Sequence, residues 1–150
     1  MTHLVEIPGK GLGLVAAKDF KAGDKIIEES VTLFCPRQVT STKQAIQLLQ
    51  QFKRLHTVDK IKVRKLFCLG KNTVFRIFST NSFSINSKYC GLFIKTSRIN
   101  HSCIPNACYN CNGSFDKQVT AIRSIVKGQE ISISYIDKFW QERAVREQEL

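Results

Sequence analysis

One short stretch of this 150-residue chain gathers side chains able to bind a polar ligand. It runs from Asn100 to Asn106 and places two amides, an imidazole, a hydroxyl and a thiol around Pro105. The apolar run at 91–94 leads into it, so these donors and acceptors need partners in a buried region. A bound polar ligand and the backbone of a crossing segment are both candidate partners. A plain Asx-rich turn closed by Pro105 is the simplest alternative.

Two further motifs carry residues suited to ligand binding or catalysis. Lys10-Gly11-Leu12-Gly13 lies near the start, where glycine lets the main chain turn and approach a ligand without a Cβ clash. A tight hairpin with no ligand needs the same glycines. Near the end, the motif at 128–135 alternates apolar and polar residues from Ile131 and finishes at Tyr135, which a core tyrosine with a paired hydroxyl would also explain. Position 16 is Ala16 rather than a third glycine, which disfavours a dinucleotide-binding loop.

In this order, the three motifs resemble the signature of SET-domain protein lysine methyltransferases. They most resemble small fungal SET proteins and the SET core of the SET-and-MYND proteins. The resemblance implies one SET domain over residues 1–150. It also implies a mostly β fold with a helical insert (α+β), built from short strands in several small sheets with a knot-like C-terminal crossing.

The resemblance further implies S-adenosylmethionine as cofactor. The residues that match cofactor-contacting positions are Lys10, Gly11, Leu12, Asn100 and His101. Asn81, in a short Asn-x-Phe segment, is carried over as a sixth contact, with a strand-edge amide as the alternative. Tyr135 matches the catalytic tyrosine. Phe83 and Phe93 suit the walls of an aromatic lysine channel, and both suit a core equally well.

Methyl transfer to lysine needs a neutral amine aligned with the methyl group. A lysine with an ordinary pKa of about 10.4 is almost wholly protonated at pH 7. Desolvation or a nearby positive charge lowers that pKa, and alignment at roughly 3–3.5 Å supplies much of the rate. This reaction requires no metal ion and no strong acid–base pair.

Strand and helix patterns predict the elements that carry these residues. Short strands between tight turns are expected at Val5–Ile7, Leu14–Ala17, Lys25–Glu29 and Val31–Phe34. Apolar residues at helical spacing predict a basic helical insert at about 40–72, interrupted near His56. Val74–Phe78 fits either a helix or a strand. Further along, we expect a hairpin of Ala107–Asn110 and Gln118–Ile122 around Asn112-Gly113, a strand at Ile131–Tyr135, and a terminal helix at about 138–150.

The formal net charge of +11 comes largely from the segment between Lys43 and Lys71. Such a basic face suits nucleic acid, and it also suits a solvated helix surface. A basic enzyme would repel a basic histone tail unless its pocket were locally acidic. The alternative function is therefore a catalytically inactive SET module that binds protein or nucleic acid through this face.

Three cysteines raise the question of a metal site. Cys103, Cys108 and Cys111 have zinc-like spacing, with His101 as a formal fourth ligand, and a zinc-held β-domain is a third reading. The resemblance implies a different use, in which Cys103 shares zinc with three cysteines of a C-terminal tail. No cysteine follows Cys111, so either the sequence is a fragment or the protein lacks the tail, and we expect Cys103 to bind zinc only if further ligands exist beyond Leu150. Because that tail closes the lysine channel in the family, a protein that lacked it would favour the inactive alternative.

Composition bounds the location and the partners. No apolar run approaches the roughly 20 residues of a membrane span, and the start lacks the features of a secretory signal. We therefore expect an intracellular protein, in nucleus or cytoplasm, with reduced cysteines and no membrane contact. The expected partner is a protein with a target lysine, with a histone as one candidate.

Overall fold

A computed structural model describes residues 2–37, 41–111 and 115–136. The chain divides into two compact units. The first unit comprises Met1–Glu28, Arg98–Asn110 and Gln118–Leu150, and the second comprises Glu29–Ser97 and Cys111–Lys117.

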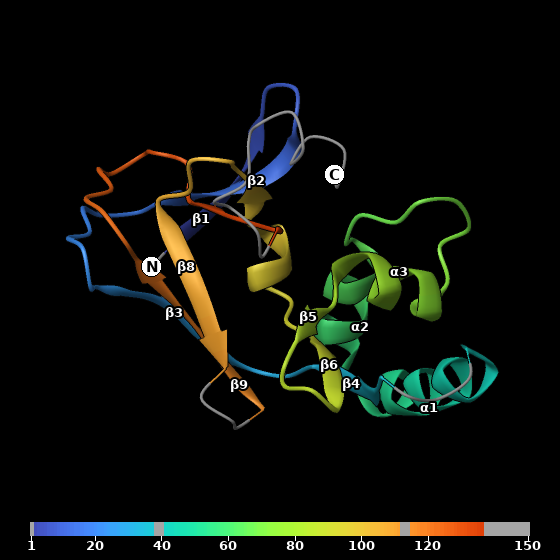
Figure 1. Ribbon diagram of the computed structural model, residues 1–150. Coiled ribbons are helices and arrows are strands. Elements are labelled where there is room, and N and C mark those ends of the chain that lie inside the picture. Colours follow the sequence, from blue (N-terminus) through green and yellow to red (C-terminus); the bar gives the residue numbers. More distant parts are fainter. Residues whose placement is uncertain (1, 38–40, 112–114, 137–150) are drawn as a thin grey trace. The chain divides into compact units, whose positions relative to one another are not determined.

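The first unit begins with an antiparallel hairpin of β1 (Thr2–Ile7) and β2 (Gly11–Ala16) (Figure 1). Its turn depends on backbone angles that favour glycine, because Gly9 and Gly11 have φ of 75° and 73°. The amide of Lys10 closes the turn with a 3.0 Å hydrogen bond to the carbonyl of Ile7. The strands and turn expected for this part of the sequence are confirmed.

A short parallel pairing in the same unit joins two distant motifs. Strand β7 (Asn100–His101) pairs with β10 (Ser132–Ile133), so that Asn100 lies opposite Ser132. The segment before β10 also bonds to β2, through Ile131 N to Leu14 O at 2.8 Å and Ala16 N to Gln129 O at 2.9 Å. These bonds bring the hairpin, the central stretch and the last motif into one neighbourhood.

A three-stranded sheet has the order β3 (Lys25–Ser30), β9 (Asp116–Ala121) and β8 (Ala107–Cys111). Strands β8 and β9 are neighbours, as the sequence predicted, while the turn residues Asn112 and Gly113 lie outside the described residues. Side chains of β9 alternate strictly, with Lys117, Val119 and Ala121 buried. Period-two burial is what a strand with one face toward the core requires.

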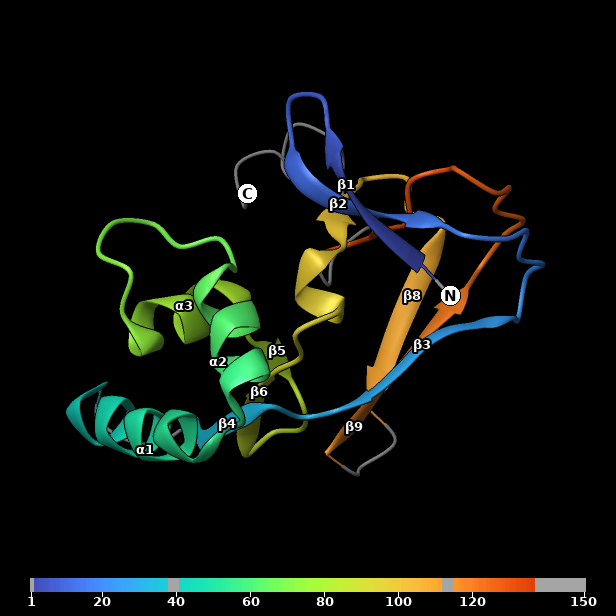
Figure 2. The same cartoon turned by 180° about the vertical axis from the view of Figure 1, so that it is seen from behind.

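The second unit combines a small antiparallel sheet with helices. Strand β6 (Tyr89–Leu92) lies between β4 (Leu33–Pro36) and β5 (Phe83–Ser84). The helices are α1 (Ser41–Arg54), α2 (Thr57–Arg64) and α3 (Val74–Asn81) (Figure 2). A single 3₁₀ turn, η1, spans Thr96–Arg98.

Helix boundaries in this unit match the sequence pattern closely. Helix α1 ends at Arg54 and α2 begins at Thr57, so the expected interruption near His56 is confirmed. The ambiguous 74–78 segment is helical, because its buried residues recur at i, i+3 and i+4. The core that these elements share includes Leu33, Leu48, Phe52, Val63, Ile77 and Leu92.

The chain departs from the predicted strand at 131–135. Only Ser132–Ile133 pairs as a strand, since the amide of Tyr135 donates instead to the ring of His101. The terminal helix predicted at 138–150, and with it the knot-like crossing, lies outside the described residues. The predicted fold class, mostly small β sheets with a helical insert, is confirmed.

Two further findings concern membrane spans and cysteines. Among the residues that it describes, no helix combines the length and apolar character needed to cross a membrane. The cysteines with described side chains form no disulfide with one another, namely Cys35, Cys68, Cys90, Cys103 and Cys108.

Candidate functional site

A carboxylate connects the hairpin to the central stretch of the first unit. Glu130 Oε2 accepts from the ammonium of Lys10 at 2.9 Å, and its Oε1 accepts from Asn100 Nδ2 at 2.9 Å. The Glu130 side chain keeps 22% of its exposure, so this network is only partly shielded from solvent. Lys10 and Asn100, which the sequence proposed as cofactor contacts, therefore share one anionic partner.

Gly13 lies against this network at very short range. A Cβ built on it would stand 2.6 Å from Asn100 Nδ2, 2.7 Å from Ile7 Cγ1 and 3.4 Å from Glu130 Oε1. Any side chain there would occupy the space in front of the Asn100 amide. Glycine at this position therefore preserves a close approach of the hairpin backbone to Asn100. The other predicted hairpin contacts lie beside it: Gly11 opens β2, and Leu12 is exposed.

His101 links the central stretch to Tyr135. Its Nδ1 accepts a 3.0 Å hydrogen bond from the Tyr135 amide, so in the neutral ring the proton sits on Nε2. That Nε2 lies 3.3 Å from the Cys103 sulfur, which accepts its hydrogen bond. The rings of His101 and Tyr135 have centroids 5.4 Å apart. His101 therefore contacts both Cys103, through Nε2, and Tyr135, through Nδ1.

The Tyr135 hydroxyl has a defined orientation. It donates a 2.6 Å hydrogen bond to the carbonyl oxygen of Ile99, which leaves its oxygen lone pairs available to accept. Tyr135 is 51% exposed, and the partial desolvation of its phenol raises its pKa above the usual value, with the negative charge of Glu130 raising it further. The phenol therefore stays protonated at neutral pH. A neutral hydroxyl is what the predicted role of Tyr135, orienting a substrate amine, requires.

Asn106, at the end of the central stretch, binds the backbone of a crossing segment. It is 2% exposed, its Nδ2 donates to the Glu130 carbonyl at 2.8 Å, and its Oδ1 accepts from the Ser132 amide at 2.9 Å. Both halves of the amide are thus used to fix the strand that leads to Tyr135. Of the two candidate partners for this stretch, the backbone of a crossing segment is therefore the partner of Asn106. Asn100, at the other end of the stretch, faces the hairpin.

Asn81 belongs to the second unit and ends helix α3 rather than standing at a strand edge. Its Nδ2 donates to the carbonyls of Phe67 at 2.7 Å and Ile77 at 2.8 Å, so its side chain holds a loop against the helix. The structure describes a supporting role for its amide within that unit. Its assignment as a cofactor contact stays a prediction.

The two candidate channel aromatics also lie in the second unit, and they face a lysine of the chain itself. The Lys117 ammonium lies 4.1 Å from the ring centroid of Phe83 and 4.9 Å from that of Phe93. The two rings meet edge to face at 6.5 Å. Lys117 and Phe93 are fully buried, so these rings take part in the core of the unit.

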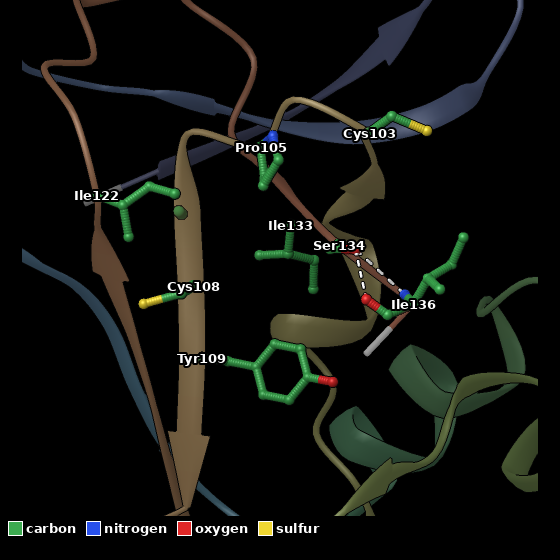
Figure 3. A pocket seen from close by; sticks show the side chains of 9 residues that line it. Cys103, Pro105, Cys108, Tyr109, Ile122, Ile133, Ser134 and Ile136 are labelled. Carbon is green, nitrogen blue, oxygen red and sulfur yellow. Dashed lines mark hydrogen bonds between the residues drawn. The ribbon is translucent and has the colours of Figure 1, made fainter. Parts of the chain in front are cut away.

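An apolar cavity of about 530 Å³ opens beside the residues that flank Tyr135 (Figure 3). Ser134 and Ile136 line it on one side, and Cys103 and Pro105 of the central stretch line it on another. The remaining lining residues are Ala107, Cys108, Tyr109, Ile122 and Ile133. Of the predicted site residues only Cys103 contributes to it. Sequence reasoning missed this cavity, because strand, loop and late-motif residues form it jointly.

Metal-binding side chains do not cluster among the residues that the structure describes, where no group of three or more ligands could hold an ion. Cys103 and Cys108 both line the cavity, while the side chain of Cys111 lies outside the described residues. Zinc ligation by Cys103 remains a prediction that depends on ligands from elsewhere.

The donor set around Gly13 suits a nucleoside with an amino-acid tail. A glycine-walled approach, an amide, an ammonium, a carboxylate and an imidazole supply both signs of charge and both hydrogen-bond roles within one unit. S-adenosylmethionine carries a carboxylate, an ammonium, a sulfonium and an adenine, which need such a mixed set. Glu130 was part of the third motif, but no pattern in the sequence indicated its contact with Asn100.

Comparisons with known proteins bear on the family and the fold of this chain. A family model for the SET domain matches residues 11–136. Histone-lysine N-methyltransferase set5 of Schizosaccharomyces pombe is 29% identical over 139 residues, which cover 89% of this chain and 41% of that protein. Protein-lysine N-trimethyltransferase SMYD5 of Mus musculus is 43% identical over 61 residues, covering 40% of this chain and 15% of that protein.

A solved structure supports the fold independently. A Plasmodium falciparum protein assigned to the histone methyltransferases superposes with a TM-score of 0.54 at 17% identity, covering 93% of this chain and 96% of that one. The chain spans less than half the length of the set5 and SMYD5 relatives that it matches. The family model covers all three sequence motifs except Lys10, and the fold agrees with it. This chain therefore belongs to the SET-domain family.

Proposed function

We propose that this chain is the catalytic module of a protein lysine N-methyltransferase that uses S-adenosylmethionine. The observation that carries the proposal is the convergence, within the first unit, of the Gly13 hairpin, Asn100-His101 and Tyr135. The names of the set5 and SMYD5 relatives support lysine methylation as the reaction. The substrate is a protein lysine, and a histone is one candidate because the set5 relative is named for histone lysine.

S-adenosylmethionine would supply an electrophilic methyl group on a sulfonium. Lys10 and Asn100, together with the backbone at Gly11 and Leu12, would hold it against the hairpin. The hydroxyl of Tyr135, fixed by its bond to Ile99, would accept a hydrogen bond from the substrate amine and align its lone pair. Because the pKa of Tyr135 is raised, the amine must lose its proton to solvent rather than to this phenol.

Calorimetric titration of the chain with S-adenosylmethionine tests the proposal at its first step. We expect saturable heat at a stoichiometry of one, with the affinity lowered at least tenfold in Asn100→Ala. Transfer of a labelled methyl group to histones and to cell extract then tests chemistry. An absence of heat and of thermal stabilisation at millimolar ligand would eliminate the enzyme proposal.

A second candidate function rests on the charge of the second unit. Helices α1 and α2 expose five basic side chains, Lys43, Lys53, Arg54, Lys62 and Arg64. The only acidic residue in these helices is Asp59, which pairs with Lys62 at 3.2 Å. We propose nucleic acid as the partner of this surface, with or without methyl transfer.

Fluorescence anisotropy with a short DNA duplex across a salt series tests that candidate. Affinity should fall steeply with salt, and Lys53→Gln with Arg54→Gln should flatten the dependence by about two units of slope. Arg123→Gln, which removes an exposed charge of the first unit, is the matched control. If the affinity for DNA changed neither with salt nor with the paired substitution, nucleic-acid binding by this surface would be excluded.

A further inference from the structure

We infer that Glu130 is a specificity-determining residue that favours the charged methyl donor over its neutral product. The inference rests on the proposed function, because it concerns the ligand of the same site. It begins from a feature that the three motifs did not reveal: one carboxylate contacts both Lys10 and Asn100.

The position of Glu130 fixes the reach of its charge. Its Oε2 pairs with Lys10 of the hairpin turn, and its Oε1 accepts a hydrogen bond from the Asn100 amide. Oε1 also lies 3.4 Å from the Cβ position of Gly13. Its backbone is held by Asn106, and it forms an isolated bridge with Val15 of β2. The carboxylate is therefore built into the crossing of three segments and cannot swing freely away from them.

The same charge acts on Tyr135, where methyl transfer would take place. Glu130 Oε1 binds the Asn100 amide at 2.9 Å, and the adjacent His101 binds the Tyr135 amide at 3.0 Å, so the carboxylate lies close along this chain of contacts to Tyr135. Its charge also raises the pKa of that phenol. A methyl group that reaches a lysine amine beside Tyr135 must be carried by a sulfonium in the same neighbourhood. The Lys10 ammonium, 2.9 Å from one carboxylate oxygen, offsets part of the Glu130 charge, and the remaining negative potential would act on the positive sulfonium.

Methyl transfer removes that positive charge from the ligand. The sulfur–carbon bond breaks, its electron pair stays on sulfur, and the methyl carbon bonds to the lysine nitrogen. S-adenosylmethionine has a net charge of +1, whereas S-adenosylhomocysteine is neutral overall. Attraction to Glu130 is thus present before transfer and lost after it, which favours donor binding and product release.

Charge selectivity can be separated from mere support of Asn100. The donor and the product share adenine, ribose and the amino-acid tail, so losing the grip of Asn100 would weaken both equally. Losing the charge of Glu130 would weaken only ligands with a positive centre at the sulfur position. Sinefungin, which carries an ammonium there, should follow the donor.

Calorimetry of the three ligands with Glu130→Gln, Glu130→Asp and wild-type chain tests the inference. We expect Glu130→Gln to lower the preference for S-adenosylmethionine over S-adenosylhomocysteine about tenfold, with sinefungin behaving as the donor does. Glu130→Asp keeps the charge and should restore most of the preference. Glu6→Gln, an exposed carboxylate on the same hairpin, is the control and should leave the ratio unchanged.

A measurement on the wild-type chain guards against a variant that fails to fold. Raising ionic strength screens a partly exposed carboxylate, so the preference for the donor should shrink between about 20 mM and about 500 mM salt. Equal losses for all three ligands in Glu130→Gln, or a ratio insensitive to both charge and salt, would overturn the inference. Wild-type chain that binds none of the ligands would instead overturn the proposed function, and with it this assignment.

Discussion

The Tyr135 hydroxyl donates a 2.6 Å hydrogen bond to the carbonyl oxygen of Ile99, and the backbone amide of Tyr135 donates a hydrogen bond to Nδ1 of His101. Ile99 directly precedes the Asn100-His101 pair, so the end of one motif is fastened at two points to the start of another. This arrangement fixes the phenol without a strand, and it makes the hydroxyl a directional acceptor toward a substrate amine.

Replacing Tyr135 with phenylalanine removes that acceptor and the hydrogen bond of the hydroxyl to the Ile99 carbonyl, while the ring remains. We expect the methyl-transfer rate to fall by about 100-fold, since a preorganised hydrogen-bond partner at the reacting centre is lost. Affinity for S-adenosylmethionine should stay within about twofold, because the hairpin and Asn100 are untouched. Labelled-methyl assays and calorimetry measure the two quantities. Tyr89→Phe, in the second unit, is the control, and a rate as high as wild type would contradict the role.

The raised pKa of Tyr135 predicts a spectroscopic and a stability effect. Its phenol should ionise at higher pH than an ordinary tyrosine. A pH titration of the difference in absorbance at about 295 nm between wild type and Tyr135→Phe measures this ionisation. Since the folded-state pKa lies above the unfolded value of about 10, its stabilising contribution is complete below about pH 10 and is lost as pH rises through the raised pKa. Ionisation at or below about pH 10 would contradict the raised pKa of this phenol.

Gly13→Ala should reduce cofactor binding by filling the approach to Asn100. The added carbon would meet Asn100 Nδ2 at 2.6 Å and Ile7 Cγ1 at 2.7 Å, so the hairpin must shift, at about 1–3 kcal/mol of unfolding free energy. We expect at least a tenfold loss of S-adenosylmethionine affinity by calorimetry.

Gly23→Ala is the matched control for that substitution. Its φ is 93°, but nothing lies within 4 Å of the new carbon, so only backbone strain of about 1 kcal/mol should result. Cofactor affinity should be unchanged there. A Gly13→Ala chain that binds the cofactor normally would show that this approach is not used.

Glu29 should make the second unit more stable in acid than at neutral pH. Burial raises the pKa of Glu29, although its bonds from the Lys95 and Thr96 amides act in the opposite direction. The stabilising contribution of its protonated form is complete below the unfolded pKa and is lost as pH rises through the raised pKa. In Glu29→Gln, the urea concentration at the unfolding midpoint should therefore change less between about pH 4 and about pH 8 than it does in the wild-type chain. Glu28→Gln, an exposed neighbour, should not; identical slopes in both variants would refute the assignment.

Lys117 should stabilise the second unit mainly through its buried stem. Lys117→Ala removes that packing and its contacts with Phe83 and Phe93, and should cost about 2–4 kcal/mol of unfolding free energy. Lys117→Met keeps the stem and should cost less than about 1.5 kcal/mol. Urea denaturation of both variants measures the difference. If methionine proved as destabilising as alanine, the charge over the two rings would be the dominant contribution.

The sequence alone indicated the family and predicted several of the elements. Glycine spacing predicted the first hairpin, apolar spacing predicted α1 and its end before His56, and the ordered motifs indicated a SET fold, because these signals depend on residues near one another in the chain. Val74–Phe78 stayed ambiguous, since five residues fit both periods until burial of Val74, Ile77 and Phe78 selected the helix.

Only the tertiary structure decided which residues meet. Asn100 and Glu130 are thirty positions apart, and their contact depends on the parallel pairing of β7 with β10 and on bonds from β2. The same motif supplied Asn106, whose amide is used up by the crossing backbone, and Asn81 was found to end a helix. Residue type cannot separate a binding amide from a structural one, because both need hydrogen bonds and the partners come from distant segments that only folding brings together.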